Sequence, residues 1–388
     1  MRKFAVLTAA GLAVAASACM WDYDTFAVEA SGKHDLVAVL AGRFERNPPL
    51  YYEMRLTHGL EELRRNPGDL EMYDNAAVAA ERLGKHDQAL AIISQKREHL
   101  KPLPADKDGW YRYFANIGTF HAHRAMSVRD QKERLADLKL AEKEIASAIE
   151  INPESHFGRE KYQLYAIRWI LSGVPHNMPF WDYLIEQGVA ERKKEEDAIR
   201  GLSGLIRLGG AWESVDIWAT LAVLLRNHQD NSLVFYAFDR VEELEKSGKK
   251  SLLNVHKLEG ELDSLSEERE RGYSPSDTLK PKNKIIYADL RRQADEWHTA
   301  RTAYMMERLK NGRHPDWDKN FWAEWEDEPK LQVPSPGFIE SIPFETKMWG
   351  GVVTVLVLLV ASPFVLFFGG RKLWRKWKLS RASQTRPA

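Results

Sequence analysis

Apolar residues recur at spacings of three and four along most of this chain, which is the pattern of amphipathic helices. The pattern is clearest over residues 69–102, and it predicts further helices at residues 155–171, 181–207, 252–271 and 285–310. No segment alternates apolar and polar residues with a period of two over the length of a strand. We therefore expect an all-α protein.

Residues 69–102 contain a turn between two helical segments, because Gly84 interrupts the run LGKHDQA while apolar spacing continues on both sides. The segment resembles a tetratricopeptide repeat, a motif of about 34 residues that folds as two antiparallel helices. Small side chains in this motif let the two helices approach closely. The matching residues are Tyr73, Ala76, Ala77, Ala80, Gly84, Ala89 and Ile93, whereas Lys96 stands where the family prefers alanine.

Two further segments match the repeat pattern less completely. The second copy is interrupted by a charged insertion around residues 127–136, which we expect to extend the loop or a helix end. The third has Gln229 in place of the turn glycine, and residues 51–67 look like a half-repeat ahead of the first copy. The resemblance implies a solenoid of helical hairpins over residues 51–272. Its residues are Phe114, Ile117, Gly118, His121, Ala141, Ile145, Ala148 and Pro153 in the second copy, and Trp218, Leu221, Ala222, Leu225, Val234, Phe238 and Val241 in the third.

The N-terminus has the layout of a secretory signal over residues 1–18, with basic residues, an uncharged apolar run, and then Ala16-Ser17-Ala18. Cys19 follows at once and is the only cysteine of the chain. Residues 16–19 resemble the lipobox of bacterial lipoproteins, which implies a diacylglycerol on the sulfur of Cys19. Leucine is commonest in that family at the position of Ala16, so ordinary signal cleavage and an incidental cysteine stay open as alternatives.

Residues 19–50 are expected to form a lead segment that begins CMWDYDT. With lipid on Cys19, we expect Trp21 and Tyr23 at the membrane interface and Asp22 and Asp24 facing water. The chain also resembles a group of bacterial envelope proteins that begin with Cys-x-Trp-Asp-x-Asp-Thr and continue into a repeat of the AVAAERLGKHDQA type. That resemblance implies no biochemical activity.

Residues 348–370 contain no charged side chain, and at about 1.5 Å per residue these 23 positions span roughly 35 Å. We therefore expect one transmembrane helix there. The tail at residues 371–388 is rich in lysine and arginine, with Trp374 and Trp377 interleaved. Positive charge marks the cytoplasmic side, so we expect a cytoplasmic tail, an extracytoplasmic body, and contact of residues 348–378 with membrane lipids.

Charge argues against nucleic acid as a partner. The chain has 56 basic and 56 acidic residues, but nine of the basic ones lie in the signal and the tail, which leaves 47 basic against 56 acidic residues in the body. An acidic body does not attract a polyanion. A basic tail can bind nucleic acid, but directly beside a membrane helix it is better placed for anionic lipid headgroups.

The last part of the body is rich in tryptophan. Residues 314–329 read HPDWDKNFWAEWEDEP, with Trp317, Phe321, Trp322 and Trp325 among acidic residues. We expect these rings to cap the last helices of the solenoid; a partner-docking or membrane-facing edge is the alternative, although the acidity argues against anionic lipid. We expect a linker at residues 273–284, a helical and Trp-rich cap at 285–328, and a proline-bearing spacer at 329–347.

Residue patterns that carry catalysis are not evident. The sequence has no G-x-S-x-G, no phosphate-cradling glycine loop and no H-E-x-x-H, so neither an enzyme nor a cofactor is predicted. His121 and His123 are two positions apart, which on a helix keeps them from binding one metal ion. The alternatives are an envelope hydrolase or metal-dependent enzyme built from scattered residues, such as His156 and Glu160, and a structural tether between two membranes.

The leading hypothesis is a membrane-anchored scaffold on the outer side of the bacterial cytoplasmic membrane. Tetratricopeptide repeats bind peptides or protein segments on the concave surface formed by their first helices, so the resemblance implies a protein or peptide partner. The implied inward-facing residues are Asp74, Val78, Glu81 and Arg82 in the first copy, Arg112, Thr119 and His123 in the second, and Asp216, Arg226 and Asn227 in the third.

Overall fold

The computed structural model describes residue 22 and residues 35–153, 158–172, 178–189, 192–227, 231–252, 260, 279–326 and 331. These residues form helices and connecting turns and contain no β-strand, which confirms the all-α class. The predictions for the signal, Cys19, the 348–370 helix and the basic tail lie outside this part of the chain. Within it, no helix has both the length and the apolar character needed to span a bilayer.

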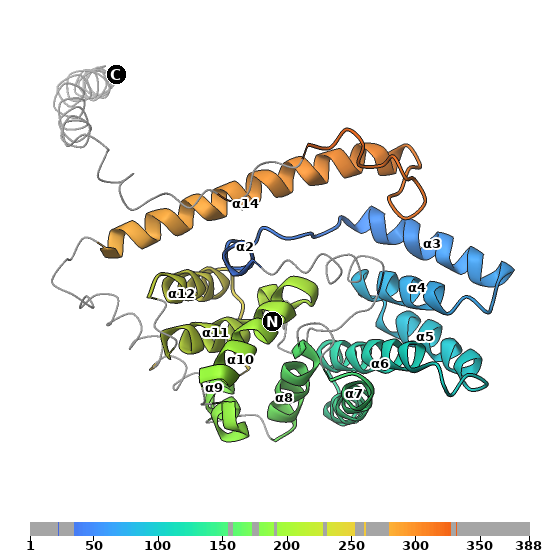
Figure 1. Ribbon diagram of the computed structural model, residues 1–388, viewed down its shortest axis with the longest axis horizontal. Coiled ribbons are helices and arrows are strands. Elements are labelled where there is room, and N and C mark those ends of the chain that lie inside the picture. Colours follow the sequence, from blue (N-terminus) through green and yellow to red (C-terminus); the bar gives the residue numbers. More distant parts are fainter. Residues whose placement is uncertain are drawn as a thin grey trace, which may run out of the picture. The chain divides into compact units, whose positions relative to one another are not determined.

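The first half of the fold is a series of helices that pack on their neighbours in sequence (Figure 1). Aspartate side chains cap three of them, since Asp69, Asp106 and Asp130 each accept a hydrogen bond from the backbone N–H three residues on. Helix α4 also packs on α6, so alternate helices touch as they do in a stacked array of hairpins. The helices of this series are α3 (Pro49–Arg65), α4 (Leu70–Arg82), α5 (His86–Leu100), α6 (Lys107–Ser127) and α7 (Gln131–Ile151), while the short α2 (Leu36–Ala41) ahead of them packs on helices from later in the chain.

Small residues set the distance between these helices. A Cβ atom built on Gly59 of α3 would lie 3.0 Å from the Cβ of Ala76 in α4, and one on Gly118 of α6 would lie 2.8 Å from the Ile145 side chain in α7. Gly84 adopts a φ of 71° between α4 and α5, a left-handed conformation that glycine reaches without strain. The predicted turn and its two flanking helices are therefore confirmed.

The charged insertion of the second copy lengthens helix ends. Helices α6 and α7 are 21 residues long each, against 13 in α4 and 15 in α5. The insertion at residues 127–136 therefore supplies the first turns of α7, and Asp130 caps them.

The second half continues the array and departs from one prediction. The helix expected over residues 181–207 is broken, because Gly188 takes a φ of 80° that ends the π-helical turn Ile185–Val189. The helical hairpin expected after residue 215 is present, with Trp218, Leu221 and Phe238 buried in it. The elements are α8 (Arg159–Leu171), α9 (Phe180–Leu184), α10 (Arg192–Leu208), the 3-10 turn Ala211–Glu213, α11 (Val215–Asn227) and α12 (Asn231–Lys246).

Helix α14 (Leu279–Lys310) contacts α12, α2 and α3, so it joins the last helices of the array to the first (Figure 1). It begins at Leu279 rather than at residue 285, and the predicted linker is therefore helical from that point. Pro281 does not prevent this, because a proline in the first turn removes no intrahelical hydrogen bond. The helix predicted at residues 252–271 lies almost wholly outside the described residues.

The Trp-rich cap packs on α3, near the start of the array, as well as on α14. Phe321 forms a buried cluster with Tyr51 of α3 and with Met305 and Leu309 of α14. The prediction that these rings cover the last helices therefore omits their packing on α3. The long α14 returns the chain to α3, a long-range arrangement that local spacing does not encode.

Candidate partner-binding site

The predicted inward-facing residues of the first copy are largely buried. Asp74, Val78 and Glu81 are at most 4% exposed, and only Arg82 is exposed, where it donates hydrogen bonds to the carbonyls that end α10. Their role as an open binding surface stays a prediction.

Lys96, which departs from the repeat pattern, is the partner of Asp74. Its Nζ atom donates to Asp74 Oδ2 at 2.6 Å, and Asn116 Nδ2 donates to Oδ1 at 3.0 Å. Burial raises the pKa of Asp74, while the lysine charge and these hydrogen bonds act in the opposite direction. Lys96 therefore compensates a carboxylate that is buried inside the array.

Glu81 is held by two histidines. Its Oε1 atom lies 2.8 Å from His86 Nδ1 and 2.7 Å from His123 Nδ1. Burial alone would raise the pKa of Glu81, but the hydrogen bonds from both rings outweigh it and lower that pKa. The hydrogen bond to Glu81 in turn raises the pKa of His86. Among the residues described, no set of His, Cys, Asp and Glu side chains is arranged to hold a metal ion.

The predicted residues of the second and third copies differ in their exposure and in their partners. Arg112 is partly exposed and pairs with Asp108 at 2.9 Å, whereas Thr119 is buried and accepts from Gln163 Nε2 at 3.1 Å. In the third copy Asp216 is buried, Arg226 is partly exposed and Asn227 ends α11. Helix α4 packs on α6, so the predicted residues of the first and second copies lie close together.

Asp216 fastens the end of the α12 segment to α11. Its carboxylate accepts hydrogen bonds from the Ser251 hydroxyl and, at 2.9 Å, from the backbone N–H of Leu252. Burial raises the pKa of Asp216 from 3.8 to about 6 because these hydrogen bonds only partly offset the loss of water.

Replacing Asp216 by asparagine is expected to remove a pH dependence of stability. A folded pKa above the unfolded one means that the folded state binds more protons between pH 4 and 6. The wild-type free energy of unfolding should therefore fall as pH rises through that window, by about 3 kcal/mol relative to Asp216→Asn. Urea unfolding in detergent at pH 4, 5, 6 and 7 measures the difference. Parallel curves for the two proteins would contradict a raised pKa of the buried Asp216 carboxyl group.

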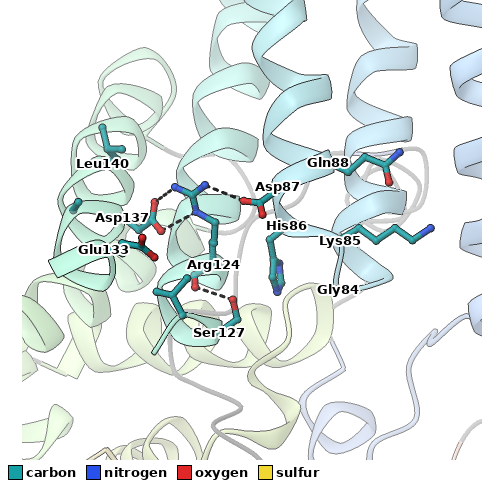
Figure 2. Close-up of a pocket in the computed structure, with 12 residues that line it drawn as sticks. Gly84, Lys85, His86, Asp87, Gln88, Arg124, Ser127, Glu133, Asp137 and Leu140 are labelled. Atoms are coloured by element: carbon teal, nitrogen blue, oxygen red, sulfur yellow. Dashed lines mark hydrogen bonds and ion pairs between the residues drawn. The ribbon is translucent and has the colours of Figure 1, made fainter. Parts of the chain in front are cut away.

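An open pocket of about 750 Å³ lies between the α4–α5 turn and the facing ends of α6 and α7 (Figure 2). Arg124 of α6 crosses it and pairs with acids on both sides, as Figure 2 shows. Its Nε and Nη2 atoms lie 2.8 and 2.5 Å from the Asp137 carboxylate, and Nη1 lies 3.0 Å from Asp87 Oδ1. The pocket is lined by Gly84, Lys85, His86, Asp87, Gln88, Arg124, Ser127, Val128, Glu133, Ala136, Asp137 and Leu140.

The charged wall of the pocket is fixed in place. His121 Nδ1 also lies 2.8 Å from Asp137 Oδ1, so Asp137 has two charged or polar partners. Burial would raise the pKa of Asp137, but its hydrogen bonds to Arg124 and His121 prevail and lower it. The hydrogen bonding between Arg124 and Asp137 in turn raises the pKa of Arg124. Arginine and aspartate therefore stay charged at neutral pH and present a rigid polar surface.

The pocket also has an apolar edge beside the charged residues of α7. Val128, Ala136 and Leu140 lie on it, and Leu140 is 40% exposed. The hydroxyl of Ser127 donates to the carbonyl of Arg124 at 2.9 Å, so it is not directed at a base. An exposed leucine beside a fixed ion pair whose carboxylate lies on the same helix, α7, suits recognition of a polypeptide segment.

Sequence reasoning did not select the pocket residues. Arg124 and Asp137 lie on either side of the insertion at residues 127–136, and this insertion is the signal that could have pointed to them, because it lengthens α6 and α7 beyond the first hairpin. Of the residues named for an enzyme, Glu160 is buried and accepts from the Tyr111 hydroxyl at 2.7 Å. His156 lies outside the described residues.

Comparison of this chain with protein-family models, with curated proteins and with solved structures finds no match. The likeness to tetratricopeptide repeats therefore stays a prediction from the residues of the hairpins. His121 and His123 meet different carboxylates, Asp137 and Glu81, as their spacing along the helix predicts.

Proposed function

We propose that this protein is a membrane-anchored scaffold of tetratricopeptide-like hairpins that binds a segment of a partner protein. In this proposal the body lies outside the bacterial cytoplasmic membrane, residues 348–370 cross it, and lipid on Cys19 supplies a second attachment. The apolar C-terminal run, the basic flank and the lipobox-like sequence support the anchoring. The helical body supports the scaffold role.

The observation that carries the proposal is the pocket between the two successive hairpins. Arg124 is held by Asp87 and Asp137 before any partner arrives, so little side-chain entropy is lost when a polar backbone docks beside it. Covering the exposed part of Leu140 contributes on the order of 1 kcal/mol. Hydrogen bonds to Glu133 and Gln88 add specificity for a polypeptide.

Photo-crosslinking from inside the pocket tests this function. With benzoylphenylalanine in place of Gln88, the full chain in its native membrane is expected to form one dominant covalent adduct with a second protein. Lys143 is the matched control, because its side chain is 73% exposed on α7 but does not line the pocket. An equal adduct from both positions, or none from Gln88 under any growth condition, would contradict a partner site in this pocket.

A further inference from the structure

The N-terminal segment and the Trp-rich cap meet at one buried arginine. Arg55 Nη1 lies 2.9 Å from Asp22 Oδ2, and its Nε and Nη2 atoms lie 2.6 and 2.7 Å from the Asp316 carboxylate. The side chains of Arg55, Asp22 and Asp316 are 2%, 5% and 11% exposed. The expectation that Asp22 faces water is therefore wrong, because it shares a guanidinium with the cap.

This contact places the start of the mature chain at the cap. Cys19 precedes Asp22 by three residues, which span at most about 10 Å when fully extended. Lipid on Cys19 would therefore enter the bilayer close to the surface formed by α3 and the cap. The other predicted anchor starts at Met348, 22 residues after Glu326, and that length reaches the same bilayer from any orientation of the cap, since an extended chain of this length spans roughly 70 Å.

The acidity of the cap is compensated by arginines from other positions. Asp316 pairs with Arg55, while Arg313 Nε lies 2.5 Å from Asp318 Oδ2 and Arg308 Nη2 lies 2.5 Å from Glu324 Oε2. The sequence-based objection to a lipid surface rested on these acids as uncompensated charges. Pairing of three of the six acids in residues 314–329 weakens that objection.

The cap also exposes aromatic rings of the kind found at membrane interfaces. Trp317 is 40% exposed, and its ring stacks on His314 and lies tilted against His58, with ring centroids 4.2 and 4.4 Å away. Trp322 and Trp325 are half-buried around Tyr304. Tryptophan combines a large apolar ring with a polar N–H, and it is enriched where one side is apolar and the other wet.

We infer that the cap, residues 314–326, lies against the headgroups of the bilayer that holds the chain, with Trp317 at the contact. This inference rests on the proposed membrane anchoring and adds which surface of the body faces the lipid. Both anchors then enter one bilayer, so the body does not bridge two membranes. The hairpin pocket remains free for a partner protein.

Spin-label accessibility in the full chain tests the inference. Lys319→Cys carries a nitroxide on the exposed side of the cap, Asn320→Cys repeats it one residue on, and Lys143→Cys on α7 is the control. The parent chain, treated identically, accounts for any label on Cys19. In vesicles of phosphatidylethanolamine and phosphatidylglycerol, both cap labels should be several-fold less accessible to a nickel chelate and more accessible to oxygen than the control.

Each other outcome overturns the inference. Cap labels as accessible to the nickel chelate as the control would place the cap in water. Labels shielded from both reagents with spin–spin broadening would show that a second copy of this chain covers it. Flotation of the same vesicles is scored separately: a chain that does not float refutes the proposed anchoring, whereas one that floats with water-exposed cap labels refutes only this inference.

Discussion

Replacing Arg55 by methionine is expected to lower the free energy of unfolding by about 3–5 kcal/mol, because it leaves two carboxylates inside the protein without their guanidinium. Asp22 and Asp316 both bond to Arg55; Arg55 and Asp22 are buried, and the Asp316 side chain is only 11% exposed. Methionine keeps most of the length of the side chain, so the loss reports charge and hydrogen bonding more than volume. Urea unfolding of the full chain in mild detergent, followed by circular dichroism, measures the change.

The matched control is Arg65→Met at the end of the same helix. Arg65 pairs with Glu62 at 2.6 Å, but its side chain is 69% exposed. Exposed pairs contribute about 0–1 kcal/mol, so this variant should unfold close to the wild type. If Arg55→Met also stays within about 1 kcal/mol of the wild type, Arg55 does not join the N-terminal segment to the cap as described.

Replacing Lys96 by methionine is expected to cost a similar amount, about 3–5 kcal/mol, because the buried Asp74 carboxyl then loses its ion-pair partner. The two side chains are 1% and 2% exposed, and their charged atoms lie 2.6 Å apart. A second change, Asp74→Asn, removes the remaining charge and keeps an oxygen that accepts from Asn116. The double variant should therefore recover most of the lost stability. The same unfolding experiment measures all three proteins.

The order of these three stabilities is the decisive feature. A double variant no more stable than Lys96→Met would mean that the cost comes from lost packing at residue 96, not from an unpaired carboxylate. A more stable double variant would explain physically why this repeat tolerates lysine at a position where small residues let helices approach.

Local sequence patterns are sufficient to predict most of the helices, but not which helices pack on one another. The α4–α5 hairpin is predicted by spacing and by Gly84, because both act within a few residues. The sequence predicts one unbroken helix at residues 181–207, because charged helix formers on both sides outweigh the single Gly188 in a local pattern. The return of the cap to α3 depends on contacts between residues 51–55 and 305–321, which no periodicity encodes.

The candidate site shows the same division. Lys96 was noticed as a departure from the repeat, but its partner Asp74 lies one helix away and is identified only when α4 packs on α5. Glu81 and Thr119 were expected on an open surface, yet contacts with α5, α6 and α8 bury them. Arg124 and Asp137 were overlooked because charged residues beside an insertion are usually solvated.

The central claim is that the pocket between the hairpins binds a partner protein, and affinity capture of paired leucine variants tests it most directly. Leu140 lines the pocket and is 40% exposed, whereas Leu103 is 47% exposed and lies outside it. From detergent-solubilised membranes, the wild type and Leu103→Asp should recover the same partner in stoichiometric amounts, and Leu140→Asp should lose it at least tenfold. Equal recovery by both variants, or no stoichiometric partner for the wild type, would contradict the claim.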